Sequence, residues 1–169
     1  SDIDKIVEIN NLRTDRDDEK GFILDSYNIE DTREKMNNGS EFYIIKNIGN
    51  DEAVGFLELS DKIDKRIPDE LSWVSEEVKN EFIPLMPKYI DRICITGSDS
   101  SRGAGSFTYK EMIKIYPTKS FYAFIVAAPV RNQSSIDFHL KNGFEKVAVF
   151  QAKQYAGFEE YESQIFLLR

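Results

Sequence analysis

The stretch that decides the fold runs from Tyr89 to Ser106 and reads YIDRICITGSDSSRGAGS. Its first part, Tyr89 to Thr96, is rich in isoleucine, which predicts a β-strand. A loop of glycine and serine follows, and a helix is expected from about Ser106 to Tyr116. The first N–H groups of a helix have no acceptor within the helix, and glycines let a phosphate approach them closely. The order strand, glycine-rich loop, helix therefore predicts an anion site.

Two common phosphate-binding motifs do not fit this loop. A P-loop requires Gly-Lys followed by Ser or Thr, and the loop contains no such sequence. A dinucleotide-binding fingerprint requires a third glycine at the position of Thr108. A plain glycine-rich connection that binds nothing stays open as the alternative at this point.

The segments on both sides of the stretch predict an α/β fold. Helical spacing of apolar residues indicates helices, alternation indicates half-buried strands, and an unbroken apolar run indicates a strand covered on both faces. Helices are expected at 2–12, 29–36 and 132–142, and strands at 41–48, 53–59, 121–128, 145–155 and 161–168. A chain of 169 residues favours one domain, residues 1–169, of the α/β class with an α+β mixed sheet.

Residues 61–88 break this order and are expected to form an insertion that carries a helix. Pro68–Glu70 suits a helix start, because proline fits the first turn and acids suit its positive end. Pro84 and Pro87 are expected to end the helix. Its apolar face is expected to pack against the domain, with a lid over a bound molecule as the alternative; that face comprises Leu71, Trp73, Val74 and Val78.

The composition excludes several classes of function. The chain has 30 acidic against 22 basic residues and a net charge of -8, which disfavours binding to nucleic acid or to an anionic membrane. With one Cys and one His, neither an internal disulfide nor a Cys/His zinc site can form. No apolar run reaches the roughly 20 residues of a membrane span, and a cytoplasmic location is expected.

A second motif lies downstream, from Asn132 to Phe144. Together with the glycine-rich loop it resembles the GNAT family of N-acetyltransferases. That family's phosphate loop reads Gln/Arg-x-x-Gly-x-Gly/Ala, and here Gly103 and Gly105 match while Ser100 replaces the first residue. The family's later helix often reads Asn-x-x-Ala, then Tyr, then Gly-Phe. The matching positions in this chain are Asn132, Ser135, His139, Gly143 and Phe144.

The resemblance implies a GNAT-like acyl-CoA N-acyltransferase fold, a splayed mixed sheet flanked by helices, with acetyl-CoA in the split. The family's first strand precedes its first helix, and that strand is apparently absent from this chain. By similarity, the pyrophosphate would bind backbone N–H groups of the loop, and Ile95 and Gly97 would pair with the pantetheine arm. Asn132 would also contact the cofactor. The expected phosphate-binding residues are Arg102, Gly103, Ala104, Gly105 and Ser106.

The implied reaction is direct attack of a primary amine, on a small molecule or peptide, on the thioester. The family's tyrosine that protonates the leaving sulfur aligns with His139, which could act as acid or as base, or be a plain polar helix residue. Asp91, four residues before Ile95, and Glu58 are the candidate bases; two solvated strand carboxylates are the alternative. Cys94, between isoleucines, is more readily a buried hydrophobe than a nucleophile. Tyr89, Tyr155 and Tyr161 are candidates for lining the acceptor side.

Two other functions stay open. One is a catalytically silent domain that binds acyl-CoA, which the departures at Ser100 and His139 keep open. The other is a nucleotide-binding enzyme that uses the same glycine-rich loop. No metal is expected, and a homodimer is left open.

Overall fold

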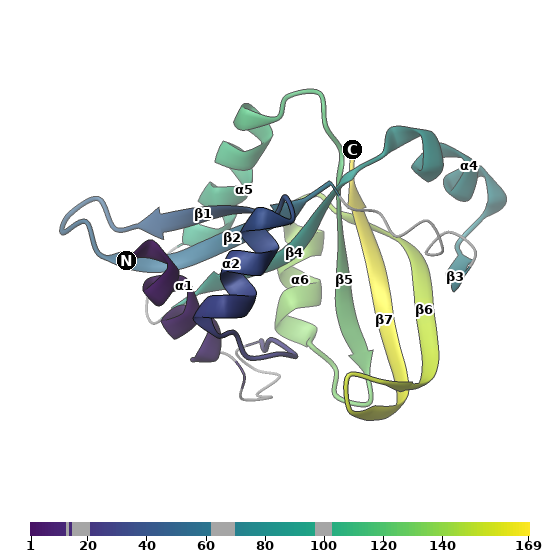
Figure 1. Cartoon of the computed structure of the whole chain (residues 1–169). Helices are drawn as coiled ribbons and strands as arrows, with labels where there is room; N and C mark the ends of the chain where they lie inside the picture. Colours follow the sequence, from purple (N-terminus) through teal and green to yellow (C-terminus); the bar gives the residue numbers. More distant parts are fainter. Residues whose placement is uncertain (13, 15–20, 62–69, 97–102) are drawn as a thin grey trace. The chain divides into compact units, whose positions relative to one another are not determined.

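The computed structural model describes residues 1–12, 14, 21–61, 70–96 and 103–169. Its strands form a mixed seven-stranded sheet in the order β1-β2-β4-β5-β7-β6-β3 (Figure 1). The chain divides into two compact units, and β4 (Lys88–Ile95) begins in one and continues in the other. The described residues of the first unit are 1–12, 14, 23–60, 90–96 and 103–117, and those of the second are 21–22, 61, 70–89 and 118–169.

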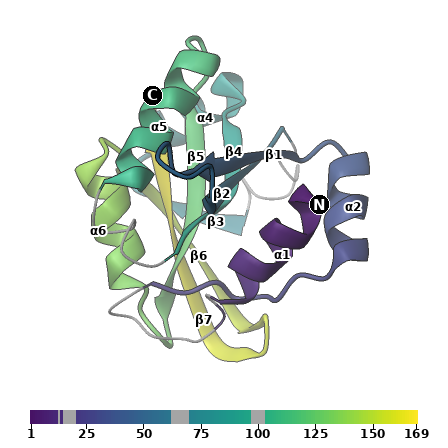
Figure 2. The same cartoon turned by 90° about the vertical axis from the view of Figure 1, so that its left-hand side faces the viewer.

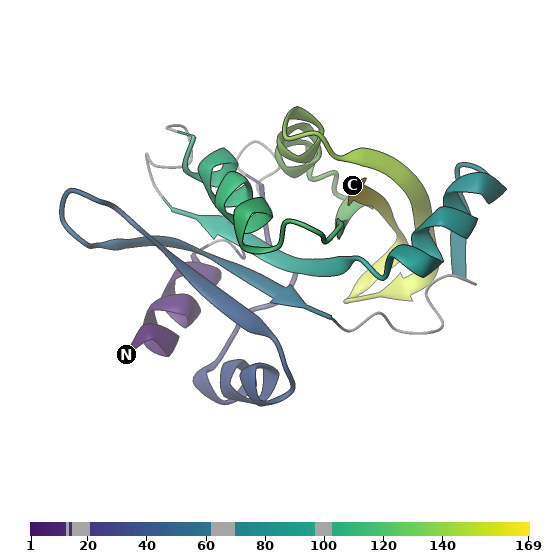
Figure 3. The same ribbon diagram turned by 90° about the horizontal axis from the view of Figure 1, so that it is seen from above.

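The first unit is built around an antiparallel hairpin. Its strands β1 (Glu41–Lys46) and β2 (Ala53–Ser60) pair so that Ile44 lies opposite Phe56. Helices α1 (Asp2–Asn11) and α2 (Ile29–Asn37) lie on one side of this hairpin, and α5 (Ala104–Ile115) lies on the other (Figures 2 and 3). The apolar side of α1 is buried because it packs on β2 and β4; the core there comprises Ile6, Ile9, Tyr27, Phe56 and Cys94.

The second unit contains the strands β5 (Phe121–Ala128), β7 (Phe158–Leu168), β6 (Glu145–Tyr155) and β3 (Leu71–Trp73). These strands pair antiparallel in that order, and the first two residues of β4 pair parallel with β5. Helix α6 (Gln133–Lys141) packs against β5, and α4 (Glu76–Leu85) follows β3. Within the described part of the chain, no helix is long and apolar enough to cross a membrane.

The mixed sheet and the flanking helices predicted from sequence are confirmed, but the expected helix in the insertion is wrong over its first turns. Leu71–Trp73 is the strand β3, whose Trp73 lies opposite Ala148 of β6. The helix begins only at Glu76, where the Ser75 hydroxyl accepts the N–H of Val78. Pro84 lies inside α4. A strand of three residues is too short to show alternation, so only pairing with β6 reveals it. Residues 62–69, which include Pro68, lie outside the described residues.

A close approach of two backbones fixes the centre of the first unit. A Cβ atom placed on Gly55 of β2 would lie 2.4 Å from the carbonyl oxygen of Cys94 on β4. Just beyond the end of β4, the N–H of Thr96 donates to the carbonyl of Val54 at 2.8 Å. The Cys94 carbonyl oxygen belongs to backbone that is held in the sheet, so displacing it would cost free energy. Only glycine therefore fits at position 55.

We expect Gly55→Ala to destabilise the protein by about 1–3 kcal/mol, because an extra methyl group in a packed core forces the backbone to shift. Thermal unfolding of the variant should show a lower Tm. Gly49→Ala is the matched control, since its Cβ would meet only the Asn47 side chain, at 3.4 Å. Equal Tm values for the two variants would contradict the close approach.

Candidate functional site

The anion site predicted from sequence falls at the N-terminus of α5. Gly103 is the N-cap residue and has φ 85°, in the left-handed region that glycine adopts without strain. The Phe107 N–H donates to the Gly103 carbonyl at 3.0 Å, which is the first bond of the helix. The N–H groups of Ala104, Gly105 and Ser106 precede it and have no acceptor within the helix. Residues 97–102, with the predicted Gly97 and Arg102, lie outside the described residues.

A cluster of charged and polar side chains lies on the α1–α2 side of β2. The Glu58 carboxylate, on β2, is fully buried. It accepts one hydrogen bond from the Tyr27 hydroxyl at 2.5 Å and one from the Lys35 ammonium at 2.8 Å. The same ammonium donates to the Asp91 carboxylate on β4 at 2.5 Å. The two carboxylates predicted from sequence are therefore joined through one lysine of α2.

The surroundings of the cluster change the acid–base behaviour of Glu58. Burial raises the pKa of its carboxyl, and the charge of Asp91 raises it further. Hydrogen bonds from Lys35 and Tyr27 oppose this rise. Burial also raises the pKa of Tyr27, so its hydroxyl stays protonated and donates. A raised pKa makes a carboxylate a stronger base, which suits it to accept a proton.

Sequence reasoning missed the other members of this cluster, which we call the Glu58 cluster: Tyr27, Lys35 and Arg92 together with Glu58 and Asp91. The Arg92 guanidinium lies 3.8 Å from the centre of the Tyr27 ring and holds the ring in place. Its Nη1 atom also donates to the Asn10 side chain at 2.8 Å. A lysine on a short polar helix looks like a solvated residue, so the sequence carries no signal for Lys35.

An apolar pocket of about 680 Å³ lies on the opposite side of β2. It runs along α5 from Gly103 to Tyr116 and is lined on the strand side by Leu57 and Leu59. Side chains alternate between the two faces of a strand, so these leucines face away from the direction of Glu58. The pocket is therefore separate from the Glu58 cluster.

Asn132, in the second unit, caps a helix. Its Oδ1 atom accepts the N–H of Ser135 at 3.2 Å, which stabilises the start of α6. Its Nδ2 atom donates to the carbonyl of Phe22 at 3.0 Å, and the residue is buried. The side-chain amide thus already has a partner at each end. Contact of Asn132 with a cofactor stays a prediction.

His139 is buried on α6, in the second unit. Its Nδ1 atom lies 2.7 Å from the Ser135 carbonyl, which can only accept, so Nδ1 carries the proton. The ring packs edge-on against Phe144, with ring centres 5.0 Å apart. Burial lowers the pKa of His139 to about 4, and the imidazole is neutral at pH 7. Its role as acid or base stays a prediction.

Cys94 and Ile95, at the end of β4, are also buried. The Cys94 thiol points to the Ile9 carbonyl at 3.5 Å, in the core between α1 and the sheet. This position is that of a small core residue. Over the described ranges, no group of three or more His, Cys, Asp or Glu residues could hold a metal ion.

Solved N-acetyltransferases share this fold over nearly the full chain. Arabidopsis thaliana NAA60, solved with a bisubstrate analogue, is 15% identical with a TM-score of 0.63, over 98% of this chain and 91% of that one. An N-acetyltransferase from Staphylococcus aureus Mu50 is 16% identical with a TM-score of 0.63, over 99% and 92%. A mutant of spermidine N-acetyltransferase SpeG from Vibrio cholerae is 12% identical with a TM-score of 0.63, over 99% and 87%.

These likenesses confirm the resemblance at the level of the fold: the chain has the fold of the GNAT N-acetyltransferases. No protein-family model matches the sequence, and no curated protein matches it either. At identities this low, the shared property is the backbone arrangement, and chemistry has to be argued from the residues themselves.

We expect the buried, neutral His139 to make the protein sensitive to acid. Its folded pKa of about 4 lies below the unfolded value of 6.5, so its contribution is present above pH 6.5 and is lost as pH falls toward 4. The full loss is about 3 kcal/mol, at 1.36 kcal/mol per pKa unit. Denaturant unfolding of wild type and His139→Phe from pH 7 to pH 4 checks this, because the variant should lack that decline. Parallel pH profiles would contradict the buried neutral ring.

Proposed function

We propose that this protein is an acetyl-CoA-dependent N-acetyltransferase, which transfers an acetyl group to a primary amine of a small molecule or peptide. The proposal is supported by the fold together with the anion site at the α5 N-terminus. The observation that supports the proposal most is the Glu58 cluster, because a buried carboxylate with a raised pKa would supply the base that amine acylation needs. The SpeG relative is a spermidine N-acetyltransferase by name, which is consistent with an amine acceptor.

The residues at the start of α5 fit the phosphates of coenzyme A. A Cβ atom on Gly103 would meet no described residue within 4 Å, which leaves room for a ligand there as far as the described residues are concerned. The N–H groups of Ala104, Gly105 and Ser106, with the positive end of the helix dipole, favour an anion there. Ile95, Gly97, Arg102 and Asn132 stay predicted contacts of the cofactor. Acetyl-CoA would supply the acetyl group as a thioester.

The acceptor amine must lose a proton before or during attack, because an ammonium has no free electron pair. In our proposal Glu58 accepts this proton, directly or through water, with Asp91 as the alternative base. Lys35 and Tyr27 hold the Glu58 carboxylate in place. The departing sulfur needs a proton, and His139 is the residue that the family resemblance assigns to that step.

One observation favours the second candidate, a catalytically silent domain that binds acyl-CoA. The neutral His139 ring already donates its Nδ1 proton to the Ser135 carbonyl. Release of thiol from acetyl-CoA with a panel of primary amines separates the two. Coenzyme A binding without turnover of any amine would favour the silent domain. Binding of ATP or NAD in place of coenzyme A would instead favour the nucleotide-binding enzyme.

We expect Glu58→Gln to lower kcat by about 100-fold or more, because a general base contributes that much. The variant should also lose the acid limb of the pH–rate profile. Glu30→Gln, which changes an exposed carboxylate on α2, is the matched control. If Asp91→Asn abolishes the acid limb and Glu58→Gln does not, Asp91 is the base. If neither variant changes it, the Glu58 cluster is not the source of the base.

We expect Gly103→Val to weaken coenzyme A binding, measured by isothermal titration calorimetry, because its side chain would fill the space that a phosphate needs. Gly39→Val is the matched control: Gly39 also has a positive φ, 95°, and an open Cβ position, but ends α2. Both variants carry similar backbone strain, so equal affinities would contradict the assigned phosphate site.

A further inference from the structure

One side of the antiparallel strands β5, β7 and β6 carries a row of touching aromatic rings, which we call the aromatic face: Tyr89, Tyr122, Phe124, Phe150, Tyr155 and Tyr161. Ring centres lie 4.9 Å apart for Tyr89–Tyr122, 6.0 Å for Tyr89–Phe124 and 6.4 Å for Phe124–Phe150. The row continues over 6.2 Å from Phe150 to Tyr161 and 4.7 Å from Tyr161 to Tyr155. All of these residues belong to the second unit.

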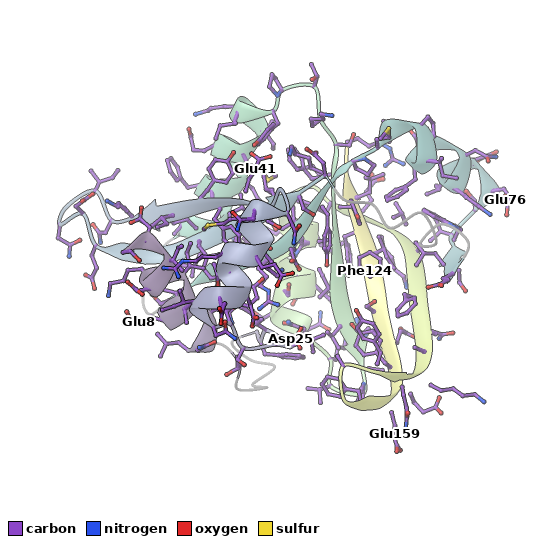
Figure 4. The ribbon with its side chains drawn as sticks, in the orientation of Figure 1. Glu8, Asp25, Glu41, Glu76, Phe124 and Glu159 are labelled. Atoms are coloured by element: carbon purple, nitrogen blue, oxygen red, sulfur yellow. The ribbon has the colours of Figure 1, made fainter. Side chains whose placement is uncertain are left out.

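The aromatic face is the side of these strands away from α6. Phe124 lies opposite Ile165 of β7, and directly opposed residues share a face. The next residue, Phe166, points to the other face, where its ring lies 6.3 Å from that of His139 on α6. Figure 1 shows α6 beside β5 and more distant from the viewer, and Figure 4 labels Phe124 on β5.

Four of the six rings of this face are partly exposed, whereas Tyr122 and Tyr161 are buried, and Phe82 of α4 packs on Tyr122 with ring centres 5.4 Å apart. Tyr89, Phe124 and Phe150 are half-buried, and Tyr155 is 50% exposed. Between Phe124 and Tyr161 the other positions on this face carry no charge: Val126, Ala148, Ala152, Ser163 and Ile165. A surface of uncharged ring faces suits a flat or apolar group. None of these five positions supplies a carboxylate to a second ammonium of a polyamine.

A hydroxyl group without a partner lies on the same face. Ser163 of β7 lies opposite both Val126 and Phe150, and it is fully buried. Among the residues that the structure describes, its Oγ atom has no hydrogen-bond partner. Leaving a buried hydroxyl unsatisfied is unfavourable, and such groups are uncommon in native proteins. A ligand that brings a polar atom to this position would remove that penalty.

We propose that the aromatic face binds the body of the acceptor, a primary alkylamine that bears an aromatic ring with one polar substituent, which pairs with Ser163 Oγ. The inference rests on the proposed function in one respect, that the bound amine is the acetyl acceptor. Binding of the amine to the aromatic face does not depend on that function. The rings supply stacking area, and the Ser163 hydroxyl supplies the one directional contact. The class of ligand is therefore a ring-bearing primary amine rather than a polyamine.

Calorimetric titration of the whole protein with tyramine, 2-phenylethylamine and spermidine tests the proposal. Tyramine and 2-phenylethylamine differ by one ring hydroxyl. Tyramine is expected to bind about 2- to 10-fold more tightly, the value of one hydrogen bond, and spermidine more weakly than either. Equal affinities of the two ring-bearing amines, or tighter binding of spermidine, would overturn the proposal.

Two variants locate the binding. Ser163→Ala should bind tyramine and 2-phenylethylamine equally, with a Tm equal to or above that of the wild type, because it removes an unsatisfied buried hydroxyl. Phe124→Leu keeps the apolar volume and should weaken both amines about 2- to 10-fold through the lost ring contact. Phe107→Leu, the same exchange on α5, should leave both affinities unchanged. Wild-type affinities in Ser163→Ala, or like behaviour of the two leucine variants, would overturn the proposal.

Thiol release from acetyl-CoA with the same amines separates this inference from the proposed function. If tyramine binds as expected and no thiol is released, the acetyl transfer fails and the binding site stands. If amines are acetylated but Phe124→Leu leaves KM for tyramine unchanged, the acetyl transfer stands and the aromatic face is not the acceptor site.

Discussion

The buried charge of Glu58 is the interaction on which the first unit depends. A carboxylate removed from water is unfavourable unless it is paired and hydrogen-bonded. Glu58 lies on β2, where every residue after Ala53 is buried, and its two oxygens receive the Tyr27 hydroxyl and the Lys35 ammonium. These donors come from the segment after α1 and from α2, and Asp91 on β4 shares the same ammonium. The folded arrangement of α2, β2 and β4 is therefore tied to the state of one carboxylate.

The same arrangement gives the carboxylate its chemistry. Burial and Asp91 raise the pKa of Glu58, whereas Lys35 and Tyr27 stabilise its charged form. A raised folded pKa means that the stability Glu58 contributes is greatest below its unfolded value and is lost as pH rises through the folded value. The effect of His139 has the opposite sign. Lowering the pH therefore reduces the contribution of His139 to the stability of the second unit and increases that of Glu58 to the stability of the first. Burying a base in this way costs stability in its charged form, and this cost is typical of residues that are kept for activity.

Much of the fold could be predicted from local sequence signals. Gly103 and Gly105 before an apolar helix indicated the N-terminus of α5, and Asn132 with Gly143 indicated the ends of α6, because capping and left-handed conformations depend on adjacent residues. The strand Leu71–Trp73 could not be predicted, since its only support is pairing with β6, far along the chain. The choice of Glu58 and Asp91 came from strand position alone, and nothing in the sequence indicated that Lys35 joins them.

The sequence by itself determined the order of the helices and strands apart from β3, the glycine at the N-cap of α5 and the exclusion of an internal disulfide or a Cys/His zinc site, because each follows from residue type and short-range spacing. Tertiary structure alone decided the raised pKa of Glu58, the lowered pKa of His139, the row of rings from Tyr89 to Tyr155 and the burial of the Ser163 hydroxyl. These properties depend on burial and on partners that are distant in sequence. Solvent exclusion and cross-strand register arise only when the chain is folded, so no local pattern of residues contains them.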